Sequence, residues 1–226
     1  MKEIDLYKPI HKYFRNLGFK VNAEVSNFDV VLFKDEIFSI VEIKLKFNLI
    51  LLRQAINAQK IADFVYVAIP IPNKKDKNFN TNIHIAKSLG IGIITVGKTA
   101  SVILEPSKSP FKKNYNKIKK VKNEVENRKV EINLGGSTRK KINTVYREKN
   151  IQIACHLEGR EAQKPKDLVK EGCSPDAQKI LYNNFFGYFT KLERGKYALS
   201  KAGYEMLLGE EFKEVYIFFK KNLKKD

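Results

Sequence analysis

The chain has 226 residues, of which 43% are hydrophobic and 30% are charged. This composition supports one sizeable core or two modest ones and argues against a disordered chain. The formal net charge of +18 favours a polyanionic partner, because each cation that neutralises a phosphate releases condensed counterions.

The positive charge is concentrated in the middle of the chain, where residues 106–149 carry 14 Lys and Arg against 4 Asp and Glu. We expect nucleic acid as the partner and no membrane, because no amphipathic Trp, Phe and Leu helix accompanies the lysine runs. No signal peptide or spanning segment is visible, so a cytoplasmic protein is expected. Cys155 and Cys173 belong to no zinc-ligand pattern, so both are expected to be reduced and structural.

The first half of the chain alternates helices and strands. Apolar residues recur at helical spacing over residues 4–17, and Gly18 follows where a helix end favours a left-handed residue. Strands are expected at 19–25, 28–33, 37–45, 64–69, 91–96 and 101–104, with helices at 49–62 and 80–89. This order predicts an α/β (α+β) domain over residues 1–105, built on a mixed sheet flanked by helices.

Residues 106–134 are expected to form a basic connector, either a solvated linker or a segment that contacts phosphates. Residues 135–226 are expected to form a smaller second domain. Helices are predicted at 138–158, 165–171, 175–186, 200–208 and 210–225, with a hairpin formed by 189–192 and 196–199. Ser174 and Pro175 suit the N-cap and first position of the third helix. Helix, turn, helix and hairpin make the outline of a winged helix.

In a winged helix the helix before the hairpin enters the major groove of DNA. Its candidate contacts are Gln178, Lys179, Tyr182 and Asn183, while Ala177, Ile180, Leu181 and Phe185 suit the core. Lys191, Arg194 and Lys196 on the hairpin suit phosphates. Winged helices also mediate protein interaction and dimerisation, so that alternative stays open.

Three polar residues interrupt the apolar second and third strands. Because side chains alternate along a strand, Glu42 and Lys44 are expected to point to one face and Ile43 into the core. If the two strands form a hairpin, Asp29 lies beside Glu42. The two carboxylates and the Ile43 carbonyl oxygen could then bind one small divalent cation, Mg²⁺ or Mn²⁺.

Phosphodiester hydrolysis requires such a set, with Lys44 orienting or deprotonating a water and contacting the phosphate. The bare spacing of Asp29 and Glu42 is common by chance. The apolar context is more informative, because buried charges are costly unless they share a partner or a metal.

The sequence resembles the PD-(D/E)XK nuclease superfamily, with Phe28 in place of the proline. A closer resemblance, to a bacterial family of unknown function described as PD-(D/E)XK phosphodiesterases with a winged-helix-like second domain, covers nearly the whole chain. It rests on Asp5-Leu6-Tyr7, Glu24-Val25, Asp29-Val30-Val31, Val41-Glu42-Ile43-Lys44, residues 63–70, Gly135-Gly136-Ser137-Thr138-Arg139, residues 144–147 and residues 184–199. The resemblance implies a restriction-endonuclease-like sheet and a metal-dependent endonuclease that hydrolyses DNA in a restriction-like or repair-type role.

The resemblance adds two candidate residues. Superfamily members often carry an extra carboxylate, which could be Glu24, although a plain surface charge is the alternative. They also often carry a polar residue on the next helix, which could be Gln54. Glu3 and Asp5, at the start of the first helix, are also acidic candidates for the site, but a role as helix-dipole partner or cap is favoured.

Two other functions stay open, a non-catalytic DNA-binding regulator that keeps the nuclease fold and an RNA nuclease. The intact Asp29, Glu42 and Lys44 argue against the regulator, while composition does not separate RNA from DNA. Duplex DNA is the expected partner. Cutting both strands of a duplex requires two active sites or two sequential nicks. A homodimer would supply two active sites.

Overall fold

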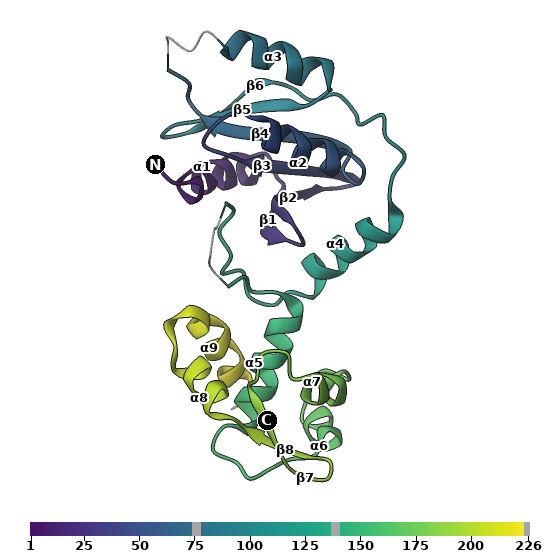
Figure 1. Cartoon of the computed structure of the whole chain (residues 1–226), viewed down its shortest axis with the longest axis vertical. Coiled ribbons are helices and arrows are strands. Elements are labelled where there is room, and N and C mark those ends of the chain that lie inside the picture. The colour runs from purple at the N-terminus through teal and green to yellow at the C-terminus, as the bar shows by residue number, and fades with distance from the viewer. Residues whose placement is uncertain (74–77, 137–140, 224–226) are drawn as a thin grey trace. The chain divides into compact units, whose positions relative to one another are not determined.

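The computed structural model describes residues 1–73, 78–136 and 141–223 (Figure 1). The chain divides into two compact units. Unit 1 comprises Met1–Asn127 and Asn133–Ile142, and unit 2 comprises Arg128–Ile132 and Asn143–Asp226.

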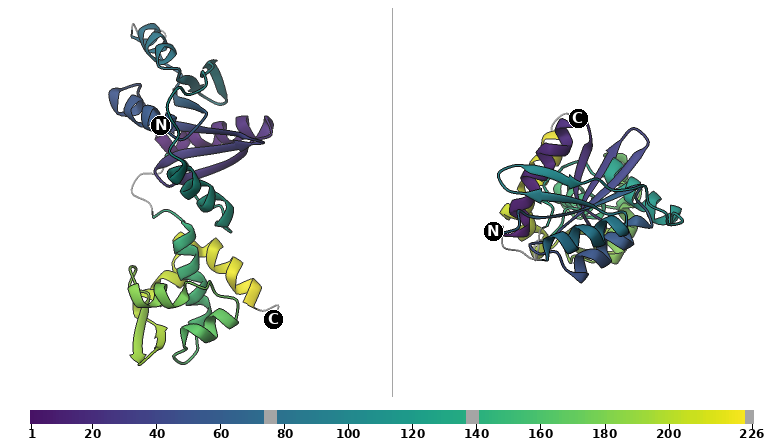
Figure 2. Two further views of the ribbon diagram at one scale, coloured as in Figure 1. Left: turned by 90° about the vertical axis from the view of Figure 1, so that its right-hand side faces the viewer. Right: turned by 90° about the horizontal axis from the view of Figure 1, so that it is seen from above.

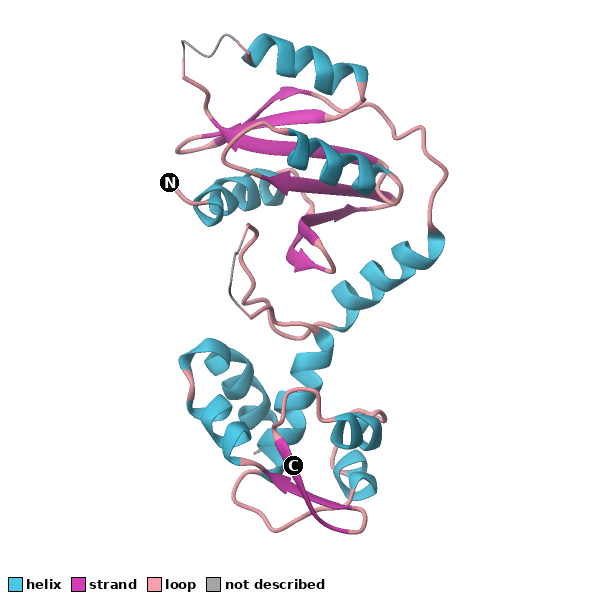
Figure 3. Ribbon diagram, in the orientation of Figure 1, coloured by secondary structure: helices cyan, strands magenta, loops and turns pink. Residues whose placement is uncertain are grey.

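Unit 1 is built on a six-stranded mixed sheet whose strands lie in chain order (Figure 3). The strands are β1 (Lys20–Val25), β2 (Phe28–Lys34), β3 (Ile37–Ile43), β4 (Phe64–Pro70), β5 (Gly92–Val96) and β6 (Ala100–Leu104). Strands β3, β4 and β5 are parallel, and the other neighbouring pairs are antiparallel. The carboxyl ends of β3 and β4 therefore meet at one edge of the sheet. The expected mixed sheet is confirmed.

Helices cover both faces of this sheet (Figures 1 and 2). Helix α1 (Glu3–Asn16) packs Ile10 and Phe14 against one face, in a core that also contains Ile43. The other face carries α2 (Leu49–Gln59), α3 (Phe79–Ser88) and α4 (Tyr115–Asn127). With both faces covered, the central strands are apolar almost throughout, as buried parallel strands usually are.

Helix α1 forms and ends where its sequence pattern requires. Its apolar residues recur every three or four positions, which places them on one buried face. Gly18 has φ +84°, and the Phe19 N–H donates to the Phe14 carbonyl oxygen at 3.0 Å. This closure needs a left-handed residue, which glycine adopts without strain.

Helix α4 lies within the partly helical basic connector expected at residues 106–134, but it packs against unit 1 and is not a solvated linker. Val121 and Val125 are buried in the core of unit 1, with Ile118 packed beside them. The Lys113 ammonium donates to the carbonyl oxygens of Gln59 and Ala62. The apolar residues lie three or four positions apart among many lysines, so one side of a basic helix is buried while the other remains charged. Unit 1 consequently extends past residue 105.

Unit 2 has its own core around helix α5 (Val145–Leu157). Its other elements are α6 (Pro165–Lys170), α7 (Ala177–Asn183), the hairpin of β7 (Phe189–Glu193) and β8 (Lys196–Leu199), α8 (Lys201–Leu208), a short 3₁₀ turn (Glu210–Phe212) and α9 (Lys213–Leu223). An isolated antiparallel bridge joins Gln163 to Tyr197 and adds a third chain segment to the hairpin.

Residues 141–144 and 175–176, which were expected to be helical, lie outside the helices. Helix α5 begins at Val145, because the Thr144 side chain caps it by accepting from the Arg147 N–H at 3.2 Å. The start expected at residue 138 lies outside the described residues, as does the end of the last predicted helix. Helix α7 begins at Ala177, with Asp176 rather than Ser174 at its N-cap.

The predicted end of α7 and the predicted burial of Phe185 were also wrong. The helix stops at Asn183, because Asn184 adopts a left-handed conformation with φ 43°. The Asn184 side chain holds this turn by bonding the backbone N–H and carbonyl of Phe189. Phe185 therefore leaves the helical register and is 74% exposed.

Both cysteines are free and buried in unit 2. Burial raises the pKa of Cys155 and Cys173 to about 12, so their thiols stay protonated and unreactive. Within residues 1–73, 78–136 and 141–223, no helix combines the length and apolarity needed to cross a membrane.

The packing of α4 can be tested by removing one buried side chain. Val121→Ala is expected to lower the free energy of unfolding by about 2 kcal/mol, because the lost methyl groups leave a cavity. Lys122→Ala, on the exposed side of the same helix, should change it by less than about 0.5 kcal/mol. Urea denaturation followed by circular dichroism measures both. Equal effects would contradict the packing of α4 against unit 1.

Candidate functional site

The structure brings Asp29 and Glu42 together on neighbouring strands. The antiparallel register of β2 and β3 pairs Val30 with Val41, which sets Asp29 opposite Glu42. The Asp29 Oδ2 atom accepts from the Ile43 N–H at 2.8 Å, and the Asp29 carboxyl is close enough to Glu42 to raise the pKa of Glu42. The arrangement expected from a hairpin is present.

Glu42 lies in an environment that opposes its ionisation. It is 1% exposed, and its Oε2 atom has no hydrogen-bond partner among the described residues. Burial, and then the Asp29 carboxyl beside it, raise the pKa of Glu42 to about 9 against the opposing effect of Lys44. Burial also raises the pKa of Asp29, although the Ile43 amide and the Lys44 ammonium oppose that shift. The pair thus retains a proton near neutral pH unless a cation joins it.

Lys44 lies just beyond the end of β3, so strand alternation does not fix the direction of its side chain. Its backbone N–H donates to the Ala68 carbonyl oxygen at 3.0 Å. Its ammonium donates to the Ile43 carbonyl oxygen at 2.9 Å and to the Glu3 Oε2 atom at 3.1 Å. The cation is therefore held between β3 and α1.

Glu3 contacts the candidate site, which the sequence pattern did not favour. A role as helix-dipole partner or cap was the favoured expectation for Glu3, yet its carboxylate pairs with Lys44 from 41 positions away. No local pattern signals such a contact. Asp5 does act as a helix cap, since its side chain accepts from the Lys2 N–H at 2.6 Å.

The segment after α4 also lies against the site. A Cβ atom on Gly135 would lie 2.8 Å from the Asp29 carbonyl oxygen and 2.7 Å from the Tyr7 ring. At Gly136, with φ +73°, it would lie 3.0 Å from the Glu3 Cβ atom. Only glycine permits this approach of the backbone. Both glycines belong to the family resemblance, but their sequence does not predict this contact. The Ser137, Thr138 and Arg139 that follow lie outside the described residues.

Glu24 affects the carboxyl pair through its charge, whereas Gln54 has no hydrogen bond to the pair among the described residues. Glu24, on β1, is close enough for its charge to raise the pKa of Glu42. Gln54, on α2, has a buried Oε1 atom that lacks a hydrogen-bond partner in the described part of the chain. Within that same part, no hydrogen bond joins Gln54 to Asp29 or Glu42.

The residues of the pair fit one small divalent cation. Among the described residues, no group of three or more His, Cys, Asp and Glu is arranged to hold a metal. Asp29 and Glu42 nevertheless offer two hard oxygen donors, which suits Mg²⁺, an ion that usually binds one or two carboxylates and keeps several waters. The buried Glu42 Oε2 atom requires either a proton or an ion as its partner. The Ile43 carbonyl oxygen already accepts from Lys44.

The candidate DNA contacts of unit 2 lie on α7 and the following hairpin. Gln178, Lys179, Lys191 and Arg194 are exposed, and Asn183 is half-buried. Tyr182 is 79% exposed. Lys196 is half-buried and pairs with Glu193 at 2.9 Å.

Comparison with known proteins gives one family match. The family described as "Putative PD-(D/E)XK phosphodiesterase (DUF2161)" matches residues 89–206. This stretch includes Gly135 and Gly136 but not Asp29, Glu42 or Lys44. Curated proteins and solved structures gave no match.

The raised pKa of Glu42 predicts a pH-dependent stability in the presence of a chelator. Between its ordinary pKa of 4.5 and about 9, the folded state holds a proton that the unfolded state releases. The free energy of unfolding should therefore contain a contribution that falls as pH rises through this window. Glu42→Gln should remove that contribution and flatten the profile.

Urea denaturation of both proteins at several pH values between about 5 and about 9 measures this effect. Glu36→Gln changes an exposed carboxylate of the same hairpin and is the control. Parallel wild-type and Glu42→Gln profiles would show that the Glu42 pKa is not raised.

Proposed function

Because the chain belongs to the family of PD-(D/E)XK phosphodiesterases that matches residues 89–206, we propose that it is a metal-dependent endonuclease that hydrolyses DNA. PD-(D/E)XK nucleases typically use divalent metals. The pairing of Asp29 with Glu42 beside Lys44 carries the proposal. A restriction-like or repair-type role is consistent with such chemistry.

Asp29 and Glu42 are the proposed ligands of Mg²⁺ or Mn²⁺. When bound, the cation neutralises charge developing on the phosphoryl group and makes a water easier to deprotonate. Glu42 must lose its proton before it can serve as a ligand, so cation binding should release about one proton. The Ile43 carbonyl oxygen is a third proposed ligand, available when Lys44 turns away from it.

Lys44 is the proposed contact to the attacking water and the scissile phosphate. Its ammonium lies next to the carboxyl pair, close enough to lower the pKa of both groups. Its ion pair with Glu3, in which both side chains are about one-fifth exposed, holds the flexible side chain near the site. Glu3 is therefore proposed as a positioning residue, and Glu24 and Gln54 as further polar contributors at the edge of the site.

Unit 2 is proposed to bind duplex DNA as a winged-helix domain. The order of α5, the Gln163 bridge, α6, α7 and the β7–β8 hairpin supports this proposal, because it matches the chain order of that module. The exposed residues of α7 would face base edges, and Lys191, Arg194 and Lys196 would contact phosphates.

The catalytic proposal predicts loss of cleavage without loss of binding. Asp29→Ala and Lys44→Ala should each abolish Mg²⁺-dependent cleavage while leaving DNA affinity within a few-fold of wild type. Gel assays with duplex, branched and single-stranded DNA and with RNA, in Mg²⁺ or Mn²⁺, measure both properties. Asp35→Ala alters an exposed residue in the turn between β2 and β3, and Lys20→Ala alters an exposed residue of β1 that pairs with Phe33. Both should cleave normally. Wild-type levels of cleavage by both Asp29→Ala and Lys44→Ala would contradict the proposed catalytic roles.

The winged-helix proposal predicts a change in salt dependence. Each of Lys191→Ala and Arg194→Ala should weaken duplex binding and reduce the slope of log Kd against log salt by about 1, because one phosphate contact is lost. Fluorescence anisotropy at several salt concentrations measures the slope. Lys221→Ala, which removes an exposed cation of α9 outside the hairpin, is the matched control. An unchanged slope in both hairpin variants would exclude the hairpin as a phosphate contact.

A further inference from the structure

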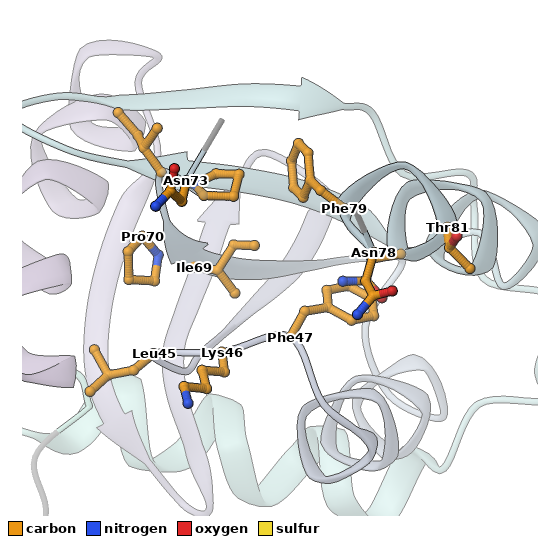
Figure 4. Close-up of a pocket in the computed structure, with 12 residues that line it drawn as sticks. Leu45, Lys46, Phe47, Ile69, Pro70, Asn73, Asn78, Phe79 and Thr81 are labelled. Carbon is orange, nitrogen blue, oxygen red and sulfur yellow. The ribbon is translucent and has the colours of Figure 1, made fainter. Parts of the chain in front are cut away.

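A cavity of about 510 Å³ opens in unit 1 where the parallel strands β3 and β4 end. Leu45, Lys46 and Phe47 lie along one side of it, and Phe79 lies on the opposite side, with Ile69 between them (Figure 4). The first turn of α3 completes the wall. The volume falls within the range of about 300–1,000 Å³ typical of ligand pockets.

A stretch of residues that lines this cavity is adjacent in the chain to the candidate catalytic residue Lys44. Leu45, which lines the cavity, directly follows Lys44. The Lys44 N–H bonds the Ala68 carbonyl oxygen, and the next residue, Ile69, also lines the cavity. Leu45 and Ile69, which both line the cavity, are therefore each one residue away from the hydrogen bond between Lys44 and Ala68. A ligand in this cavity would thus lie close to the backbone of Lys44.

The lining side chains match the chemistry of a nucleotide. Phe47 and Phe79 are half-buried, packed against the core, and form part of the cavity wall. Aromatic rings are the usual platforms on which unpaired bases stack. Asn82 and Thr81 supply an amide and a hydroxyl, which can donate to and accept from base edges.

The charge of the cavity also favours a nucleotide. Lys46 adds a cation to the wall, and none of the described residues that line the cavity is acidic. Leu45 and Ile71 at the lining are 40% and 65% exposed, and this apolar surface would be covered by the base or sugar of a bound nucleotide. A phosphate would meet Lys46 or Lys44 while the base enters the cavity.

We propose that this cavity binds one unpaired nucleotide next to the scissile phosphate. The inference rests on the proposed nuclease function and deepens it by naming the substrate class. A base can enter only after it leaves the helical stack, which costs least where the strand is already unpaired or mismatched. The enzyme should therefore prefer single-stranded, mismatched or branched substrates over a fully paired duplex.

The experiment measures binding of the full chain in the presence of a chelator, so that cleavage does not enter. The probes are short oligonucleotides that carry a fluorescent adenine analogue, in deoxy and ribo forms, either single-stranded or fully paired. Phe79→Leu removes the stacking ring but keeps apolar volume. Phe33→Leu, another half-buried phenylalanine at the other end of the sheet, is its matched control.

Phe79→Leu should raise the Kd for the single strand by about tenfold, because loss of one base–aromatic stack weakens binding by about that factor. Phe33→Leu should leave this Kd unchanged, and neither variant should alter the Kd for the paired duplex. Lys46→Ala should weaken single-strand binding more than Lys20→Ala does. Comparison of the deoxy and ribo arms shows which sugar the cavity accepts.

Equal effects of Phe79→Leu and Phe33→Leu, or no binding of single strands by wild type, would overturn the inference. If Phe79→Leu fails to fold, as judged by its circular dichroism, Asn82→Ala replaces it with the same expected selectivity. The two proposals fail separately. Cleavage that requires Asp29 but ignores Phe79 overturns the cavity alone, whereas Phe79-dependent binding without any metal-dependent cleavage overturns the nuclease alone.

Discussion

Two carboxyl groups that share a place shielded from water cannot both ionise without a cation between them. Asp29 and Glu42 are in this situation, because the pairing of β2 with β3 holds them side by side. The Ile43 amide fixes one oxygen of Asp29, and Lys44 supplies the nearest positive charge. The proposed chemistry depends on this repulsion between the two carboxylates. A pair that holds a proton when no cation is bound can exchange that proton for a metal ion.

The sheet topology explains why the other features of unit 1 gather at the same edge. Strands β3 and β4 are parallel, so their carboxyl ends meet, and the chain leaves both strands next to Lys44. Ligand sites in sheets with parallel strands commonly lie beyond those ends. The carboxyl pair, the ion pair with Glu3 and the cavity with Phe47 and Phe79 therefore follow from one structural arrangement.

The family match and the candidate site occupy different parts of the sequence. The matched stretch begins at residue 89, after the strands that carry the carboxyl pair. It nevertheless contains Gly135 and Gly136, whose backbone lies against Asp29 and Glu3. The two glycines thus connect the matched stretch physically to the site within unit 1.

The sequence by itself determined the features that depend on neighbouring segments. Alternating apolar residues located the strands, and the short hairpin brought Asp29 opposite Glu42, because strand pairing across a tight turn leaves little freedom of register. The Gly18 helix end was equally predictable, since it depends on local backbone conformation.

Only the tertiary structure decided the contacts between distant segments. The pairing of Glu3 with Lys44, the approach of Gly135 to Asp29 and the burial of Val121 all join residues far apart in sequence. Phe185 became exposed because a single left-handed residue ended its helix early. Such contacts depend on how whole elements pack, and residue pattern alone does not specify that packing.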